Sequence, residues 1–309
     1  MSSTQLAGRT AIVTGAGAGL GRAEALALAT AGANVVVNDM GEAADAVVEE
    51  IKALGVGAVA VKGDVSQWAI GDQLVEAAVD SFGSLDIVVN NAGVIRDTML
   101  FNLTESQWDD VIAVHLKGHA VVSRAAATYW RGASKAAGGP IYGRLINTAS
   151  EAFLFGSAGQ PNYAAAKAGI TALTLSAHQG LSRYGVTANV ICPRARTAMT
   201  EKVFDADRQA VESGGLDILA PERVGTFVSW LGSPAAAKVS GQVFVVYGDM
   251  VALMAAPVVE QKFTSPTGEF TLDQLDEQLV SHFADRSPHQ TYSAYSVAEL
   301  DTTGVATLG

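Results

Sequence analysis

The chain has 309 residues, of which 49% are hydrophobic, enough to bury a sizeable core in one large α/β domain or two smaller domains. Its formal net charge of −11 argues against nucleic acids and anionic membrane surfaces as partners, and its single cysteine, Cys192, excludes an internal disulfide and suits a reducing compartment. We expect a cytoplasmic protein, because the N-terminus has no signal pattern and no apolar run approaches the roughly 20 residues that a membrane span requires.

Short apolar segments alternate with helix-forming segments along most of the chain. Strands are predicted near residues 10–14, 34–38, 58–62, 85–90, 143–148, 187–191 and 242–246. Helices are predicted over residues 20–31, 42–54, 67–82, 105–130, 161–184 and 222–231. Because the strands are nearly all apolar, we expect a parallel sheet covered on both faces. This pattern predicts a doubly wound, Rossmann-type α/β fold of about seven strands in one domain, residues 1–255.

Two segments interrupt or follow that alternation. Residues 131–140 are rich in Gly, Ala and Ser, so we expect an inserted surface loop there. Residues 256–309 form a C-terminal extension that we expect to be partly helical. The apolar run at 250–259 is only half as long as a membrane span.

The first predicted strand runs directly into a cluster of glycines that opens the next helix. The spacing is Gly15-x-x-x-Gly19-x-Gly21, with Gly17, Ala18 and Leu20 between these positions. Glycines at such a bend let the backbone approach a pyrophosphate, and the helix N-terminus supplies amides and partial positive charge. A glycine-rich turn alone is weak evidence, because many strand-to-helix turns contain one. Its position between a strand and a helix favours a dinucleotide-binding site.

The second predicted strand ends at Asp39, twenty residues beyond Gly19. A carboxylate at this place can accept hydrogen bonds from the adenosine ribose hydroxyls and would repel a 2′-phosphate. No basic residue lies between Val37 and Glu42. The sequence therefore predicts NAD rather than NADP as cofactor, with a helix N-cap as the structural alternative for Asp39.

A third group of polar residues lies in the second half of the chain. Tyr163 and Lys167 are four residues apart on a predicted helix, and Ser150 precedes them by thirteen residues. A phenol has a pKa of about 10, so proton transfer near neutrality needs roughly 4 kcal/mol of differential stabilisation. We expect the Lys167 ammonium to lower the pKa of Tyr163 and to make it a general base. The alternative is an exposed helix that happens to carry one Tyr and one Lys.

Taken together, these motifs resemble the short-chain dehydrogenase/reductase family over residues 5–250. The family's glycine turn falls on Thr14 to Gly21 and its Asn-Asn-Ala-Gly segment on residues 90–93, so the resemblance implies cofactor contacts from Asn91, Ala92 and Gly93. It implies further cofactor contacts from Asp64 and Val65. It also places the family's catalytic Ser, Tyr and Lys on Ser150, Tyr163 and Lys167, with Ser150 and Tyr163 binding the substrate hydroxyl and Lys167 the nicotinamide ribose.

One branch is more similar still, the (3R)-hydroxyacyl-CoA dehydrogenase module of peroxisomal multifunctional enzyme type 2. The similar stretches are residues 15–22, 35–39, 91–97, 114–118 and 198–200, with residues 260–263 and 271–283 of the extension. The resemblance implies a small-molecule substrate, most directly a 3-hydroxyacyl-CoA, including one that bears a steroid. A free hydroxysteroid and a 3-oxoacyl-carrier-protein substrate stay open. Arg194 and Arg196 are candidate cations for the CoA phosphates.

Two positions depart from the wider family. His115 stands where an Asn usually kinks the helix and holds a water in a proton relay, so we include His115 among the candidate catalytic residues. His115 and His119 also have the spacing of a zinc pair, but no Glu follows His115 and no third ligand is evident, so we expect no metal. Pro193-Arg194 replaces the usual Pro-Gly before the nicotinamide.

Other classes of protein fit less well. The chain has no G-x-S-x-G elbow of a serine hydrolase and no G-x-x-x-x-G-K-[ST] loop of an NTPase. A nucleotide-sensing scaffold is the non-enzyme alternative, but such a protein would have lost one of the three catalytic residues. The family resemblance also implies a homodimer or homotetramer, paired through the helices at 105–130 and 161–184.

Overall fold

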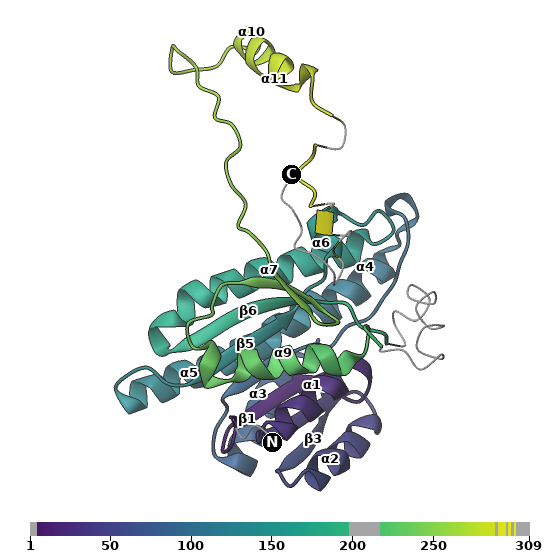
Figure 1. The fold of residues 1–309 in the computed structure, drawn as a ribbon, viewed down its shortest axis with the longest axis vertical. Helices are drawn as coiled ribbons and strands as arrows, with labels where there is room; N and C mark the ends of the chain where they lie inside the picture. The colour runs from purple at the N-terminus through teal and green to yellow at the C-terminus, as the bar shows by residue number, and fades with distance from the viewer. Residues whose placement is uncertain (1–4, 198–216, 288–289, 295, 298–299, 301–309) are drawn as a thin grey trace.

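The computed structural model describes residues 5–197, 217–287, 290–294, 296–297 and 300. Within these residues one sheet of eight strands forms the centre of the molecule, which confirms the predicted doubly wound α/β fold (Figure 1). The strands are β1 (Thr10–Thr14), β2 (Asn34–Asp39), β3 (Ala58–Lys62), β4 (Ile87–Asn90), β5 (Gly143–Thr148), β6 (Val186–Pro193), β7 (Val243–Tyr247) and β8 (Met250–Leu253).

The strand order is β3-β2-β1-β4-β5-β6-β7-β8, and every pair except β7–β8 is parallel. The order reverses between β1 and β4. In an open parallel sheet the loops at the carboxyl ends of two such strands diverge and leave a crevice between them. The loops that follow β1 and β4 carry the glycine turn and the Asn90-Asn91-Ala92-Gly93 segment.

Helices cover both faces of the sheet. They are α1 (Gly19–Thr30), α2 (Ala43–Ala53), α3 (Trp68–Phe82), α4 (Glu105–Val111), a π-helical segment (Ile112–Lys117), α5 (Gly118–Ala137), α6 (Ala152–Phe155), α7 (Pro161–Leu181) and α9 (Pro221–Gly232). Alternate strand residues point to opposite faces, so Val13 packs with α1, α2 and α9 while Ile12 packs with α3 and α5. Both faces are buried, which explains why the strands are nearly all apolar.

The expected surface loop at residues 131–140 is wrong, because α5 continues through Ala137. Ala and Lys are strong helix formers, and Ser134 is buried with its hydroxyl donating to the Gly139 carbonyl. The helix ends where Gly138 adopts a left-handed conformation (φ 68°), as many helices do.

The sequence reading also missed strand β8. Gly248 (φ 61°) occupies the first position of a two-residue turn after Tyr247, and the chain folds back so that Tyr247 pairs with Met250. A Gly-x turn between two apolar runs is a recognised hairpin signal. The apolar stretch after Asp249 is therefore partly an antiparallel edge strand.

The extension leaves the body of the molecule beyond β8 and returns to it. Figure 1 shows α10 (Leu272–Leu275), a π-helical turn (Asp276–Val280) and α11 (Ser281–Ala284) standing apart from the sheet, with the chain coming back near α6. The division at residue 255 remains a prediction. No helix among the described residues is both long enough and apolar enough to cross a membrane.

Candidate active site

The glycine turn is shaped by close backbone contacts. A Cβ at Gly15 (φ 61°) would lie 2.7 Å from Ala92 Cα, and one at Gly21 would lie 2.3 Å from the Gly15 carbonyl oxygen. Neither contact is possible for a real side chain, so the α1 N-terminus can pack this closely only with glycine. The turn thus presents the amides at the start of α1 to the crevice, as a pyrophosphate requires.

Asp39 at the end of β2 braces this turn. Its Oδ2 accepts a hydrogen bond from the Gly17 amide at 2.9 Å, and its Oδ1 accepts one from the Met40 amide at 2.7 Å. The N-cap of α2 is Glu42, so the helix-cap alternative for Asp39 is wrong. A carboxylate has further lone pairs, so both oxygens can still accept from ribose hydroxyls.

The other predicted cofactor residues follow strands β3 and β4. Asn91 donates through Nδ2 to the Thr14 carbonyl oxygen at 3.1 Å, and the Thr14 hydroxyl accepts from the Asn91 and Ala92 amides. Burial acts to raise the pKa of Asp64, but hydrogen bonds from the Ser66 amide and hydroxyl outweigh it and lower that pKa. Asp64 is therefore fixed as an anion beside Val65.

A cavity of about 390 Å³ joins these groups to the candidate catalytic residues Tyr163 and Lys167. It is lined by most of the predicted site residues, namely Gly15, Ala18, Gly19, Leu20, Asp39, Asp64, Val65, Asn91, Ala92, Gly93, His115, Tyr163 and Lys167. Gly17, Gly21 and Ser150 do not line it. The two glycines shape the turn instead, and the Ser150 side chain is hydrogen-bonded to Tyr163.

Ser150 and Tyr163 come together at the carboxyl end of β5. Ser150 begins the turn after β5, where its Oγ accepts from the Ala152 amide at 3.2 Å, and Tyr163 lies in the first turn of α7. Burial raises the pKa of Tyr163 to about 12, while a hydrogen bond with the Ser150 side chain opposes the rise. The structure thus brings the two hydroxyls together.

Lys167 lies one turn further along α7 and is only 2% exposed. Its Nζ donates to the Thr148 carbonyl oxygen at 2.6 Å and lies 5.3 Å from the Tyr163 ring centroid. Burial lowers the pKa of Lys167 to about 7. The expected lowering of the Tyr163 pKa by Lys167 is therefore not seen, because burial raises that pKa and the opposing contribution comes from Ser150 rather than from Lys167.

His115 stabilises the segment that follows β4. Its Nε2 lies 3.0 Å from the Val94 amide nitrogen and 2.8 Å from the Val94 carbonyl oxygen, and its ring meets Tyr163 edge-on at 5.1 Å between centroids. Burial lowers the pKa of His115 well below its usual value, so the imidazole is neutral. No group of three or more possible metal ligands occurs among the described residues, the neighbourhood of His115 included.

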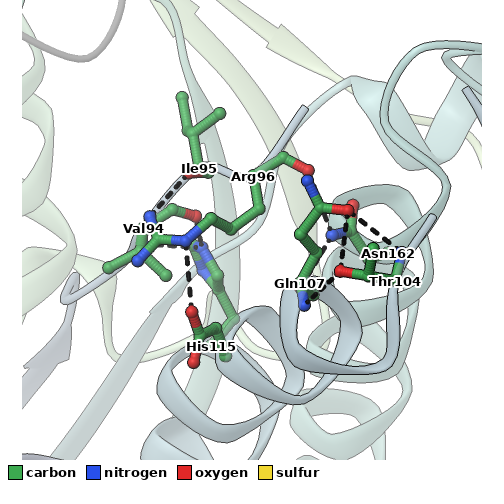
Figure 2. A network of polar contacts seen from close by, with 8 residues as sticks. Val94, Ile95, Arg96, Thr104, Gln107, His115 and Asn162 are labelled. Carbon is green, nitrogen blue, oxygen red and sulfur yellow. Dashed lines mark hydrogen bonds and ion pairs between the residues drawn. The ribbon is translucent and has the colours of Figure 1, made fainter. Parts of the chain in front are cut away.

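Asn162 is a site residue that the sequence reading missed. It is fully buried, its Nδ2 donates to the carbonyl oxygens of Arg96 and Gln107, and its Oδ1 accepts from the Tyr163 amide at 2.8 Å. Figure 2 shows this network, in which the 94–96 segment is held between His115 and α4. Asn162 thereby ties the start of α7 to α4. An Asn after Pro161 at a helix start was the available signal.

The expectation for Arg194 as a phosphate-binding cation is not supported. Its guanidinium pairs with Glu151 at 2.6 Å, and it is already used by two backbone carbonyls. Arg196 lies 3.6 Å from Asp217 in a looser ion pair. The similar stretch at residues 198–200 lies outside the described residues.

This chain belongs to the short chain dehydrogenase family, whose sequence profile matches residues 9–208. It is therefore an oxidoreductase that acts on a CH–OH group, which confirms the class expected from its motifs. The chain is 56% identical over 300 residues to the hydroxyacyl-CoA dehydrogenase ChsB1 of Mycobacterium tuberculosis, covering 95% of this chain and 94% of that protein.

Two further comparisons agree with that assignment. Peroxisomal multifunctional enzyme type 2 of Mus musculus is 40% identical over 240 residues, 74% of this chain but only 30% of that longer protein. The crystal structure of a short chain dehydrogenase from Mycobacterium avium superposes with a TM-score of 0.80 at 44% identity, covering 92% of this chain and 97% of that one.

Proposed function

We propose that the protein is an NAD-dependent dehydrogenase that interconverts a 3-hydroxyacyl-CoA and the corresponding ketone, including substrates whose acyl part bears a steroid. The observation that carries the proposal is that Tyr163 and Lys167 line the same cavity as the glycine turn, with the Ser150 side chain hydrogen-bonded to Tyr163. The name of the 56% identical relative supports the acyl-CoA class.

Each catalytic residue has a separate task in this proposal. Tyr163 takes the proton of the substrate hydroxyl, and Ser150 donates a hydrogen bond to the same oxygen as its negative charge develops. Lys167, whose Nζ lies 5.3 Å from the Tyr163 ring centroid, supplies positive charge near the phenol when it is protonated. Oxidised nicotinamide, when bound, supplies the hydride acceptor and a further positive charge.

We propose that the main role of His115 is to hold Val94 and the Tyr163 ring in place. Its Nε2 holds Val94, and its neutral ring supports the Tyr163 ring from the side. The buried Nδ1 has no hydrogen-bond partner among the described residues. That atom is available to a water in a proton relay, the role expected from the sequence.

The choice of NAD rests on charge around the adenosine end of the cavity. Asp39 lines it, and the only cationic side chain among its described lining residues is Lys167, at the opposite end. The nearby Lys62 is paired with Glu42 and Asp45. A 2′-phosphate would therefore meet a carboxylate, and the described residues that line this end of the cavity offer no compensating cation.

The kcat/KM of the unmodified enzyme should be at least tenfold higher with NAD than with NADP. This ratio corresponds to about 1.4 kcal/mol in activation free energy. Asp39→Asn should narrow this ratio, because the amide removes the negative charge yet keeps an oxygen for the Gly17 amide. Steady-state rates of both proteins with NAD and with NADP give this ratio. Equal use of the two cofactors by the unmodified enzyme would refute the proposed preference.

The substrate class is tested by NADH formation across a panel of (3R)- and (3S)-hydroxyacyl-CoAs of different chain length, free hydroxysteroids and a 3-hydroxyacyl carrier protein. We expect the highest kcat/KM with a hydroxyacyl-CoA. A clear preference for a free steroid would replace this proposal by the hydroxysteroid alternative. Preference for the carrier-protein substrate would indicate the reductase alternative.

We also propose a cytoplasmic homodimer or homotetramer. In α5 and α7, small residues such as Ala127 and Ala164 lie outside the fully buried face and allow close helix packing between subunits. Light scattering at micromolar protein should give two or four times the mass of one chain. A monomer at that concentration would contradict the assembly.

A further inference from the structure

Arg194 is held in an unusually complete set of contacts just beyond β6. Its Nε and Nη2 donate to the two carboxylate oxygens of Glu151 at 2.6 and 2.7 Å. Its Nη1 and Nη2 also donate to the carbonyl oxygens of Leu300 and Val297, at 3.0 and 2.5 Å. The planar fork of a guanidinium can satisfy such a set, whereas an ammonium cannot.

These contacts join two parts of the chain that are far apart in sequence. Val297 and Leu300 belong to the returning end of the C-terminal extension, and Glu151 directly follows Ser150. The guanidinium also stacks 4.8 Å from the Tyr247 ring centroid, and the Tyr247 hydroxyl donates to the Leu300 carbonyl oxygen at 3.1 Å. The pair is largely shielded from water, with side-chain exposures of 16% for Arg194 and 11% for Glu151.

The returning segment also binds α6 directly. The Ala294 amide donates to the Leu154 carbonyl oxygen at 2.8 Å, and the Ser293 hydroxyl donates to the Phe155 carbonyl oxygen at 2.9 Å. Val297 is 3% exposed and lies in an apolar cluster with Ala149, the residue before Ser150. The extension therefore packs against both sides of the turn that carries the catalytic serine.

We propose that Arg194 is a positioning residue that clamps the returning C-terminal segment onto Glu151 and so fixes the Ser150 turn for the substrate. Glu151 is the link, because its carbonyl oxygen accepts from the Leu154 and Phe155 amides while its carboxylate is held by Arg194. The Ser150 hydroxyl in turn accepts from the Ala152 amide inside the same turn. The kinetic part of this inference rests on the proposed function.

The test compares Arg194→Lys with Arg124→Lys, a matched control in which an arginine paired with Asp72 on α3 is changed far from the site. Arg194→Lys should lower kcat for the best hydroxyacyl-CoA by about tenfold to 100-fold, since small displacements of reacting groups cost this much. The Kd for NADH should not change, because the glycine turn and Asp39 lie elsewhere. Arg124→Lys should leave both values as they are.

Hydrogen exchange supplies a readout that does not depend on the substrate. In Arg194→Lys, amides of residues 154–156 and the Ala294 amide should exchange faster together, while those of β1 and β2 stay protected. Tyr247→Phe should produce a smaller change of the same kind, because it removes the hydroxyl contacts to Leu300 and Arg194 but leaves the bonds between Arg194 and Glu151. Normal kcat, or faster exchange in the C-terminal segment alone, would overturn the clamp.

The two proposals can fail separately. If the unmodified enzyme turns over no hydroxyacyl-CoA, the proposed substrate class is wrong, but joint exchange in the two segments still supports the clamp. If turnover of hydroxyacyl-CoA is high and Arg194→Lys matches Arg124→Lys in both measurements, the clamp is wrong and the proposed function stands.

Discussion

Tyr163→Phe should lower turnover by about 10²- to 10⁴-fold, the usual loss when a positioned general base is removed. The substitution deletes one oxygen and keeps the ring, so the edge-on contact with His115 is preserved. The Kd for NADH should change little, because the glycine turn and Asp39 hold the other end of the cofactor. Steady-state turnover and NADH binding by fluorescence measure the two quantities.

Tyr129→Phe is the matched control for that experiment. Tyr129 lies on α5, partly buried against the core that α3 and α5 share, so the same oxygen is removed away from the cavity. Its turnover should equal that of the unmodified enzyme. Near-normal turnover in Tyr163→Phe would show that another residue accepts the proton.

Glu24→Gln should stabilise the protein at alkaline pH. Glu24 lies on α1, is fully buried, and neither of its carboxyl oxygens has a hydrogen-bond partner among the described residues. Burial raises its pKa from 4.5 to about 8, although Lys167 opposes the rise. Between these values the unfolded chain loses a proton that the folded chain keeps, so stability falls as pH increases. The upper limit is about 5 kcal/mol, from the difference of about 3.5 in pKa.

The pH dependence identifies the cause. The variant and the unmodified protein should have similar free energies of unfolding near pH 4.5, and the difference should grow until about pH 8 and then stay constant. Chemical denaturation at a series of pH values measures it. Glu76→Gln, the same exchange at an exposed position on α3, should show no such trend. A pH-independent difference would mean that Glu24 is ionised or paired in the folded protein.

Local sequence patterns were sufficient for the parts of the site that adjacent residues create. The glycine turn follows from a strand, a bend and a helix in sequence, and the face shared by Tyr163 and Lys167 follows from helical periodicity. Asp39 could be placed because the acid that binds the ribose follows the glycine turn by about twenty residues. These features depend on neighbours along the chain, so one sequence is enough to predict them.

Burial and long-range pairing were harder to predict. The sequence gives no sign that Glu24 is enclosed, or that burial raises the pKa of Tyr163. Arg194 was expected to bind phosphate, but its partners lie over forty residues before it and over one hundred after it. Strand β8 and the last turns of α5 are hard to predict for a simpler reason, because glycine, alanine and serine are common both in loops and, as at Gly248 and residues 131–137, in hairpins and helices.

The double attachment of the extension makes it a natural place to enlarge the protein. The chain leaves at Met254, whose amide donates to Val243, and is fastened again at Ser293 and Ala294. Because the entropy of closing such a loop grows only slowly with its length, added residues there cost little stability. The exposed turn at 266–268 could therefore carry a fluorescent reporter domain, while the catalytic core and its C-terminal fastening stay intact.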